Sequence, residues 1–192
     1  MEKVVMNGDI KEISILEYYP NRMSKLVDLT PEQLITNQFV YNFKNGHRPT
    51  VILAAKIVAS IIEKHFNLKK EQLTFVPIPA SNYEDTAVRY NLFSYLVSLF
   101  CKVTNGHKWV NNWEKVDKKH LTRQKENHDY TNRWFVDYGK IKGAKLIVLD
   151  DVITTGETAK AFVKRIENCG GKVIGMVFLA RTIEIKKALE DE

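Results

Sequence analysis

One stretch, residues 146–158, constrains the fold of this chain more than any other, and it reads LIVLDDVITTGET. Its first four residues are a continuous apolar run, which is typical of a strand buried on both faces of a parallel sheet. The Thr-Thr-Gly segment predicts a turn, because its glycine can adopt a positive φ. From Glu157 onward apolar residues recur at helical spacing. The sequence therefore predicts a buried strand, a turn and a helix in direct succession.

The turn and the two acids before it predict a site for a phosphorylated sugar. A helix that begins at the turn leaves backbone N–H groups unpaired beside threonine hydroxyls, and this arrangement suits a phosphate. Asp150 and Asp151 would repel each other at the end of a buried strand. At the carboxyl edge of a sheet, however, they can accept hydrogen bonds from neighbouring sugar hydroxyls. Phosphate and diol together describe a ribose 5-phosphate. The alternative is an ordinary strand–helix turn with solvated acids, and the complete string favours the site.

The same string resembles the 5-phosphoribosyl-1-pyrophosphate (PRPP) signature of type I phosphoribosyltransferases. That signature is an apolar strand, two acids, an apolar pair, Thr-Thr-Gly, any residue and Thr, and every position is filled here. The resemblance implies that Asp150 and Asp151 are catalytic residues that hold the ribose hydroxyls. The residues that it implies for the 5-phosphate are Thr154, Thr155, Gly156, Glu157 and Thr158. It also implies an α/β fold with a parallel sheet flanked by helices, a small hood from the two ends of the chain and a mobile basic hairpin.

A second predicted strand, Leu73–Pro79, ends in two prolines and is followed by small polar residues. In the type I family a loop at this position holds the pyrophosphate of PRPP. The resemblance therefore implies that Ala80, Ser81 and Arg89 contact pyrophosphate. The order of four segments is similar to the ComF-like, competence-associated branch of the family, here without its N-terminal zinc module. These segments are residues 76–79, 89–91, 121–124 and 132–135.

The segment from Lys102 to Gly139 is basic and carries three tryptophans. It could bind single-stranded nucleic acid through residues 102–135, with tryptophans as stacking platforms, or it could be a solvated charged hairpin. The resemblance adds a third interpretation, which we favour: a mobile loop that closes over the site and excludes water. Lys119 and Arg123 would then be catalytic residues that neutralise the departing pyrophosphate.

Outside these motifs the sequence predicts an ordinary succession of helices and strands. We expect one or two strands within Val4–Tyr19, a helix from Thr30 to about Gly46, and a second helix over Thr50–Phe66. A third helix is expected from Glu84 to Val103, with a buried stripe. The residues of this stripe are Leu92, Tyr95, Leu96, Leu99 and Phe100. A last buried strand, residues 173–179, should precede Arg181, which we expect to be a surface ion-pair partner.

The length, composition and net charge of the chain limit the classes of protein to which it can belong. A length of 192 residues suits one domain, in which we expect residues 73–181 to form the core and residues 1–50 the hood. The two cysteines have no paired spacing, the five histidines have no ligand spacing, and the N-terminus lacks a signal-peptide pattern. These features favour a cytoplasmic protein without disulfides, a protein-bound metal or a membrane segment. The net charge of +6 favours anionic partners without choosing among them.

We therefore predict transfer of the 5-phosphoribosyl group from PRPP to a nitrogenous acceptor, a nucleobase or a related amine, with release of pyrophosphate. Mg²⁺ would be carried by PRPP oxygens, and the family implies a homodimer. One alternative is a non-catalytic protein on the same fold that senses PRPP or a nucleotide, or binds single-stranded nucleic acid. Another is a doubly wound nucleotide-binding domain unrelated to PRPP, which is disfavoured because the chain has neither a Gly-rich dinucleotide turn nor a P-loop.

Overall fold

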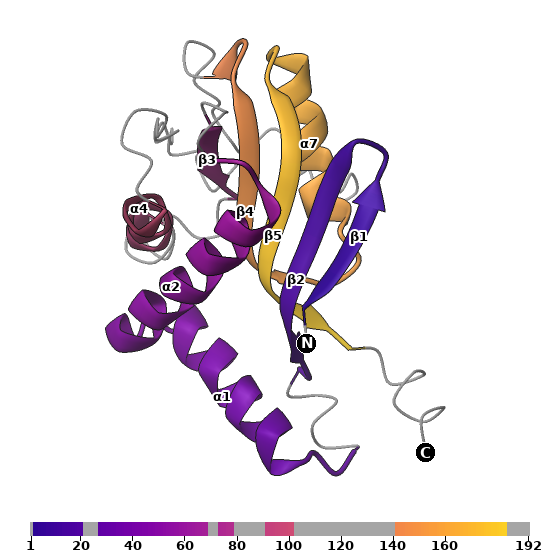
Figure 1. Ribbon diagram of the computed structural model, residues 1–192. Coiled ribbons are helices and arrows are strands. Elements are labelled where there is room, and N and C mark those ends of the chain that lie inside the picture. The colour runs from indigo at the N-terminus through magenta and orange to yellow at the C-terminus, as the bar shows by residue number, and fades with distance from the viewer. Residues whose placement is uncertain (1, 21–26, 69–72, 79–90, 102–140, 184–192) are drawn as a thin grey trace, which may run out of the picture.

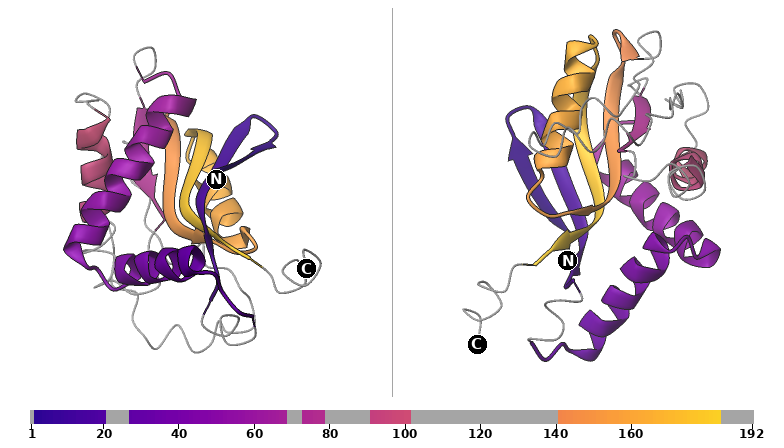
Figure 2. Two further views of the ribbon diagram at one scale, coloured as in Figure 1. Left: turned by 60° about the horizontal axis from the view of Figure 1, so that its bottom comes forward. Right: turned by 180° about the vertical axis from the view of Figure 1, so that it is seen from behind.

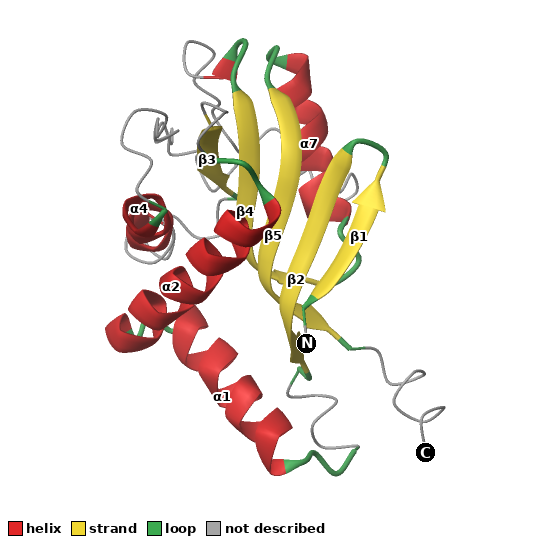
Figure 3. Cartoon of the chain, in the orientation of Figure 1, coloured by secondary structure: helices red, strands yellow, loops and turns green. Residues whose placement is uncertain are grey.

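The computed structural model describes residues 2–20, 27–68, 73–78, 91–101 and 141–183 of the chain. Within these residues a five-stranded sheet lies between helices on both of its faces (Figure 1). The predicted α/β class and the sheet flanked by helices are thereby confirmed (Figure 3). The elements in chain order are β1 (Lys3–Asn7), β2 (Ile10–Tyr18), α1 (Pro31–Lys44), α2 (Arg48–His65), β3 (Leu73–Pro77), α4 (Asn91–Phe100), β4 (Lys145–Ile153), α7 (Glu157–Asn168) and β5 (Lys172–Thr182).

The strands follow the order β1-β2-β5-β4-β3 across the sheet. Only β1 is antiparallel to its neighbour, and β2, β5, β4 and β3 all run in the same direction. The carboxyl ends of four strands therefore meet at one edge of the sheet. In open α/β sheets this edge is where ligands bind.

Alternation along β4 divides the core into two halves. Ile147 and Leu149 face the layer of α1, α2 and α4, whereas Leu146 and Val148 face α7. All four side chains are fully buried, as expected of a parallel strand that is covered on both faces. Figure 2 shows the helices on the two sides of the sheet. The two positions after Leu149 continue the alternation, so adjacent residues there also point to opposite faces.

Helix α1 is capped and docked by specific polar contacts. Thr30 and Gln33 form the predicted capping box, in which Gln33 N–H donates to Thr30 Oγ1 (3.3 Å) and Thr30 N–H donates to Gln33 Oε1 (2.8 Å). Asn37 then ties the helix to the residue after β2, because its side chain accepts from Tyr19 N–H (2.9 Å) and donates to Tyr19 O (2.8 Å). These bonds hold α1 beside the carboxyl edge of the sheet.

The N-terminal strands and the second helix agree with expectation. The stretch Val4–Tyr19 contains both β1 and β2, and α2 begins two residues before the predicted Thr50. Both strands belong to the central sheet, and α1 packs on β2. Among the described residues, no helix combines the length and the apolar character that crossing a membrane requires.

Two local predictions were wrong. The strand predicted to end at Leu149 continues to Ile153, so both acids lie inside β4 rather than after it. The buried stripe of the third helix is misplaced in part: Tyr95 (50%) and Leu99 (55%) are exposed on α4. The other stripe residues, Leu92, Leu96 and Phe100, are partly buried against the core, as predicted. The face that packs is centred on Phe93 instead, whose ring meets that of Phe43 edge-on with centroids 5.1 Å apart. The described part of this helix begins at Asn91, and the predicted residues 84–90, 102 and 103 lie outside the described residues.

Candidate functional site

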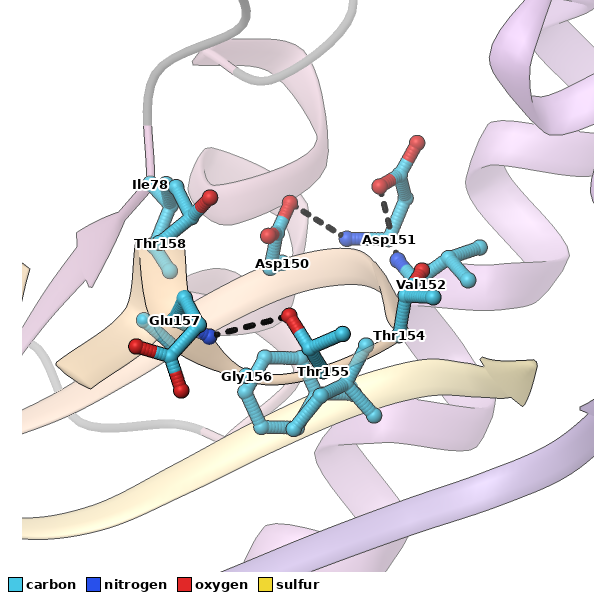
Figure 4. Close-up of a pocket in the computed structure, with 12 residues that line it drawn as sticks. Ile78, Asp150, Asp151, Val152, Thr154, Thr155, Gly156, Glu157 and Thr158 are labelled. Atoms are coloured by element: carbon cyan, nitrogen blue, oxygen red, sulfur yellow. Dashed lines mark hydrogen bonds between the residues drawn. The ribbon is translucent and has the colours of Figure 1, made fainter. Parts of the chain in front are cut away.

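An open cavity of about 220 Å³ lies at the carboxyl end of β4, where the strand turns into α7 (Figure 4). It brings together the two acids and the whole turn that the sequence singled out. The lining residues are Ile78, Asp150, Asp151, Val152, Ile153, Thr154, Thr155, Gly156, Glu157, Thr158, Ala159 and Phe178. Ten of these twelve, residues 150–159, form a single run of chain from the end of β4 to the first turn of α7.

The turn places the amino end of α7 against the cavity. Gly156 is the N-cap residue and adopts φ +78°, a left-handed conformation that favours glycine. Thr155 Oγ1 accepts a hydrogen bond from Glu157 N–H at 3.4 Å. The first N–H groups of a helix have no intrahelical partner, and the helix dipole adds partial positive charge at the same point. An anion such as phosphate would be stabilised here.

The two carboxylates emerge on opposite sides of β4. By the alternation of a strand, Asp150 continues the Leu146–Val148 face, which packs on α7, and Asp151 continues the other face, where Lys44 of α1 lies near it. Each carboxylate is held by the backbone just after it. Asp151 N–H donates to Asp150 Oδ1 (2.8 Å), and Val152 N–H donates to Asp151 Oδ1 (2.7 Å). Both acids keep further lone pairs for hydroxyl groups of a ligand.

The two acids differ in electrostatic environment. Burial raises the pKa of Asp150 well above its usual range, and the negative charge of Asp151 raises it further. The charge of Asp151 also contributes, after burial, to a raised pKa of Tyr18 at the end of β2. An acid with a raised pKa binds its proton more firmly, so Asp150 takes up a proton at a higher pH than an ordinary aspartate.

The structure adds two residues that sequence reasoning missed. Lys44, in the last turn of α1, has its Nζ 4.0 Å from Asp151 Oδ2 and 5.3 Å from the ring centroid of Tyr18. Thr182, at the end of β5, has its Oγ1 3.2 Å from Thr154 Oγ1. Thr182 could have been found, because the carboxyl ends of neighbouring parallel strands meet. No local signal in the sequence points to Lys44.

The residues predicted to contact pyrophosphate lie outside the described residues, and their roles stay predictions. These residues are Ala80, Ser81, Arg89, Lys119 and Arg123. The described chain stops at Ile78, which lines the cavity and whose N–H donates to Leu149 O at 2.8 Å. The chain therefore leaves β3 at the cavity, which is compatible with a following loop that serves the same site.

Arg181 forms an ion pair, as predicted, but the pair is largely buried rather than at the surface. Its guanidinium contacts the carboxylate of Glu12, and its Nε donates to Ser14 Oγ at 3.3 Å. Both partners are buried side chains of β2. Arg181 therefore bridges β5 and β2 and is not among the residues that line the cavity.

The donor set of the cavity suits a hydrated Mg²⁺ that arrives with its ligand. Within the described parts of the chain, no three His, Cys, Asp or Glu side chains are grouped so that they could hold a metal ion. Asp150 and Asp151 supply hard carboxylate oxygens. Mg²⁺ retains several waters and is often bound by one or two carboxylates together with phosphate oxygens of a substrate.

Comparison with known proteins gives a family match over part of the chain. The model of the phosphoribosyl transferase domain matches residues 107–191. Over 38 residues the chain is 55% identical to an adenine phosphoribosyltransferase of Thermosipho africanus, which is 20% of this chain and 22% of that protein. Over 56 residues it is 32% identical to the transcriptional regulator GfcR of Methanobrevibacter smithii, which is 29% of this chain and 28% of that protein.

A solved structure of Leishmania donovani UMP synthase superposes on 76% of this chain and 25% of that one, with a TM-score of 0.42 and 16% identity. The matched segments span less than a third of the length of the adenine phosphoribosyltransferase and of GfcR. Residues 107–191, which include β4, the turn, α7 and β5, are similar to the phosphoribosyl transferase domain.

Proposed function

We propose that this chain is a phosphoribosyltransferase, which binds PRPP and transfers its 5-phosphoribosyl group to a nitrogenous acceptor. The observation that carries the proposal is the cavity at the end of β4, which is lined by Asp150, Asp151 and the amino end of α7. The family match over residues 107–191 supports the same reaction class. Phosphate on the helix and hydroxyls on the acids would orient one ribose 5-phosphate unit.

Each part of the site has a proposed role in the reaction. The turn Thr154–Thr158 anchors the 5-phosphate, and Asp150 and Asp151 hold the ribose hydroxyls. A nitrogen of the acceptor forms a bond to C1 of the ribose, while the bond from C1 to pyrophosphate breaks and its electron pair leaves with pyrophosphate. No protein nucleophile is needed, so the chain contributes by positioning the sugar and by stabilising charge.

Neutralisation of the negative charge on the departing pyrophosphate is proposed for residues outside the described part of the chain and for Mg²⁺. Ala80, Ser81 and Arg89 would contact the pyrophosphate, and Lys119 and Arg123 would neutralise it as the loop closes. Mg²⁺ bound to the phosphate oxygens supplies further positive charge when present. The acids are the described residues suited to contact that ion or its waters.

The finer parts of the proposal rest on the sequence. These are the similarity to the ComF-like branch, a hood built from residues 1–50, pairing of subunits and action in the cytoplasm. Adenine is the first acceptor to test, because the matched segment is similar to adenine phosphoribosyltransferases.

The proposal is tested by calorimetry with Mg²⁺-PRPP, ribose 5-phosphate and pyrophosphate, followed by an assay of pyrophosphate release with a panel of bases and amines. We expect the double variant Asp150→Asn, Asp151→Asn to remain folded and to lose PRPP binding. Asp9→Asn with Glu167→Gln removes the same charge from two exposed positions and should bind as the wild type does. Unchanged affinity in the first double variant would refute the ribose assignment.

A second candidate function is a regulator that binds PRPP or a nucleotide without catalysis. The partial similarity to GfcR favours it, and residues 102–135 would then contact nucleic acid. Ligand binding without pyrophosphate release, together with salt-sensitive binding of single-stranded DNA or RNA, would support this function over the enzyme.

A further inference from the structure

Among the ion pairs of the described residues, Lys44 is the basic side chain that lies beside the acid pair of β4, Asp150 and Asp151. Its Nζ lies 4.0 Å from Asp151 Oδ2, and the two side chains are 37% and 14% exposed. The ammonium group also lies over the ring of Tyr18, 5.3 Å from the centroid, where a cation is attracted by the ring face. Lys44 thus approaches the site from α1, an element to which the PRPP signature gives no role.

The position of Lys44 is well defined by its helix. The two hydrogen bonds between Asn37 and Tyr19 fix α1 beside the carboxyl end of β2. Lys44 then follows Asn37 by about two turns of helix. It lies in the last turn, where the helix dipole itself favours a positive charge. The lysine therefore needs little rearrangement to remain near Asp151.

The carboxylates of the cavity repel an anionic ligand, and the positive charge of Lys44 can offset part of this repulsion. Asp150 and Asp151 project from β4, and Glu157 projects from α7, so three carboxyl groups face or border a site proposed for a polyanionic ligand. On the α7 side Lys160 is paired with Glu157 at 3.2 Å. On the α1 side Lys44 is the partner of Asp151. Among the described residues, Tyr18 on β2 also lies close enough to Asp151 for the charge of this acid to contribute, after burial, to the raised pKa of the tyrosine hydroxyl.

We propose that Lys44 is a positioning residue of this site: its charge holds the Asp151 carboxylate in place and offsets the repulsion between the acid pair and a sugar phosphate. This inference rests on the proposed function, because it takes the same cavity to be the PRPP site. Lys44 acts through Asp151 and not by touching the reacting atoms. It extends the site from the β4–α7 unit to the N-terminal part of the chain.

The test compares Lys44→Gln, Lys44→Arg and Lys56→Gln in the full chain. Lys56 is a matched control, since it is an exposed lysine on α2 that contacts the Phe100 ring and neither acid. Ribose 5-phosphate and Mg²⁺-PRPP are titrated by calorimetry at low salt over a range of pH. We expect Lys44→Gln to weaken both ligands about fivefold, the upper range for a partly exposed pair. Lys44→Arg should restore most of the affinity, and Lys56→Gln should have no effect.

The pH profile separates this role from a structural one. The charge of Lys44 lowers the pKa of Asp150, against the larger effects of burial and of Asp151. Without Lys44, Asp150 should take up its proton at higher pH, so the midpoint of the affinity profile should move upward. A change that only disturbed the packing of α1 would weaken binding without moving this midpoint. High salt should reduce the difference between Lys44→Gln and the wild type.

The outcomes distinguish the inference from the function on which it rests. Absence of binding by the wild type to either ligand would refute the proposed function. Binding by the wild type with an unchanged affinity and midpoint in Lys44→Gln would refute the role of Lys44 alone. An equal loss in Lys56→Gln would also refute it, because the effect would then be one of net charge.

Discussion

Replacement of Gly156 by alanine tests the phosphate turn most directly. This residue is the N-cap of α7 and has φ +78° and ψ 1°. An alanine Cβ would lie 3.4 Å from Ile153 Cδ1 and 3.8 Å from Ile153 Cγ1, which are ordinary contacts. The cost must therefore come from the backbone, since a left-handed conformation costs a residue with a side chain about 1–2 kcal/mol. We expect Gly156→Ala to lower the free energy of unfolding by that amount.

The same substitution should weaken phosphate binding. The chain can relieve the strain by moving the turn, which shifts the N–H groups at the start of α7. If about 1.4 kcal/mol of anchoring is lost, the affinity for ribose 5-phosphate falls tenfold. Urea unfolding gives the stability and calorimetry gives the affinity. Gly156→Asn should behave more like the wild type, because asparagine tolerates the left-handed region.

Gly143→Ala is the matched control for this experiment. Gly143 has φ +75°, no atom lies within 4 Å of its added Cβ, and it precedes β4 at the opposite edge of the sheet. It should lose a similar stability and keep full affinity. If Gly156→Ala also kept full affinity, the turn would not be the phosphate anchor. If it lost no stability, the strain argument would be wrong.

Three further predictions concern stability and reactivity. Asp150→Asn should stabilise the protein increasingly as the pH rises above about 4. An acid whose pKa is raised in the folded protein lowers the free energy of unfolding once the same acid ionises in the unfolded chain. Equal pH dependence of urea unfolding in the variant and the wild type would contradict this. Gly175→Ala should cost about 1–3 kcal/mol, because its Cβ would lie 2.3 Å from Phe66 Cζ, and Phe66→Leu should cost less in that background than in the wild type. The Cys101 thiol, whose pKa burial raises to about 12 with a smaller effect from the charge of Glu63, should resist alkylation at about pH 8 until the protein is unfolded; rapid labelling of the folded protein would refute its burial.

The parts of the fold that could be predicted depend on local signals. The apolar run before Asp150, the glycine of the turn and the spacing of apolar residues in α7 all lie within about two dozen residues, and each has a direct structural cause. The Thr30 capping box is equally local. The buried face of α4 could not be predicted in this way, because two polar residues, Ser94 and Ser98, lie on the face that packs. Which residues pack was decided by contacts with other elements, such as the Phe43 ring on α1.

The same distinction between local signals and long-range contacts applies to the residues of the site. Asp150 and the turn were found from one continuous segment, and the structure brings them into one cavity. Lys44 and Thr182 reach the site from separate elements, through the docking of α1 and the pairing of β5 with β4. Thr182 could be inferred only by first pairing β5 with β4. The proximity of Lys44 is a long-range property that no periodicity or motif of the sequence reports.

The order of the strands also bears on when this protein can fold as it is synthesised. The last described strand, β5, lies between β2 and β4, so it is the strand that joins the N-terminal hairpin to the rest of the sheet. The contact between Arg181 and Ser14 spans 167 residues of sequence. Until β5 leaves the ribosome, one edge of β2 and one edge of β4 have no strand to pair with. Such non-local pairing is slow to form and exposes strand edges to other chains. Completion of the sheet, and with it the Arg181 bridge between β5 and β2, must therefore follow synthesis of residues 172–182.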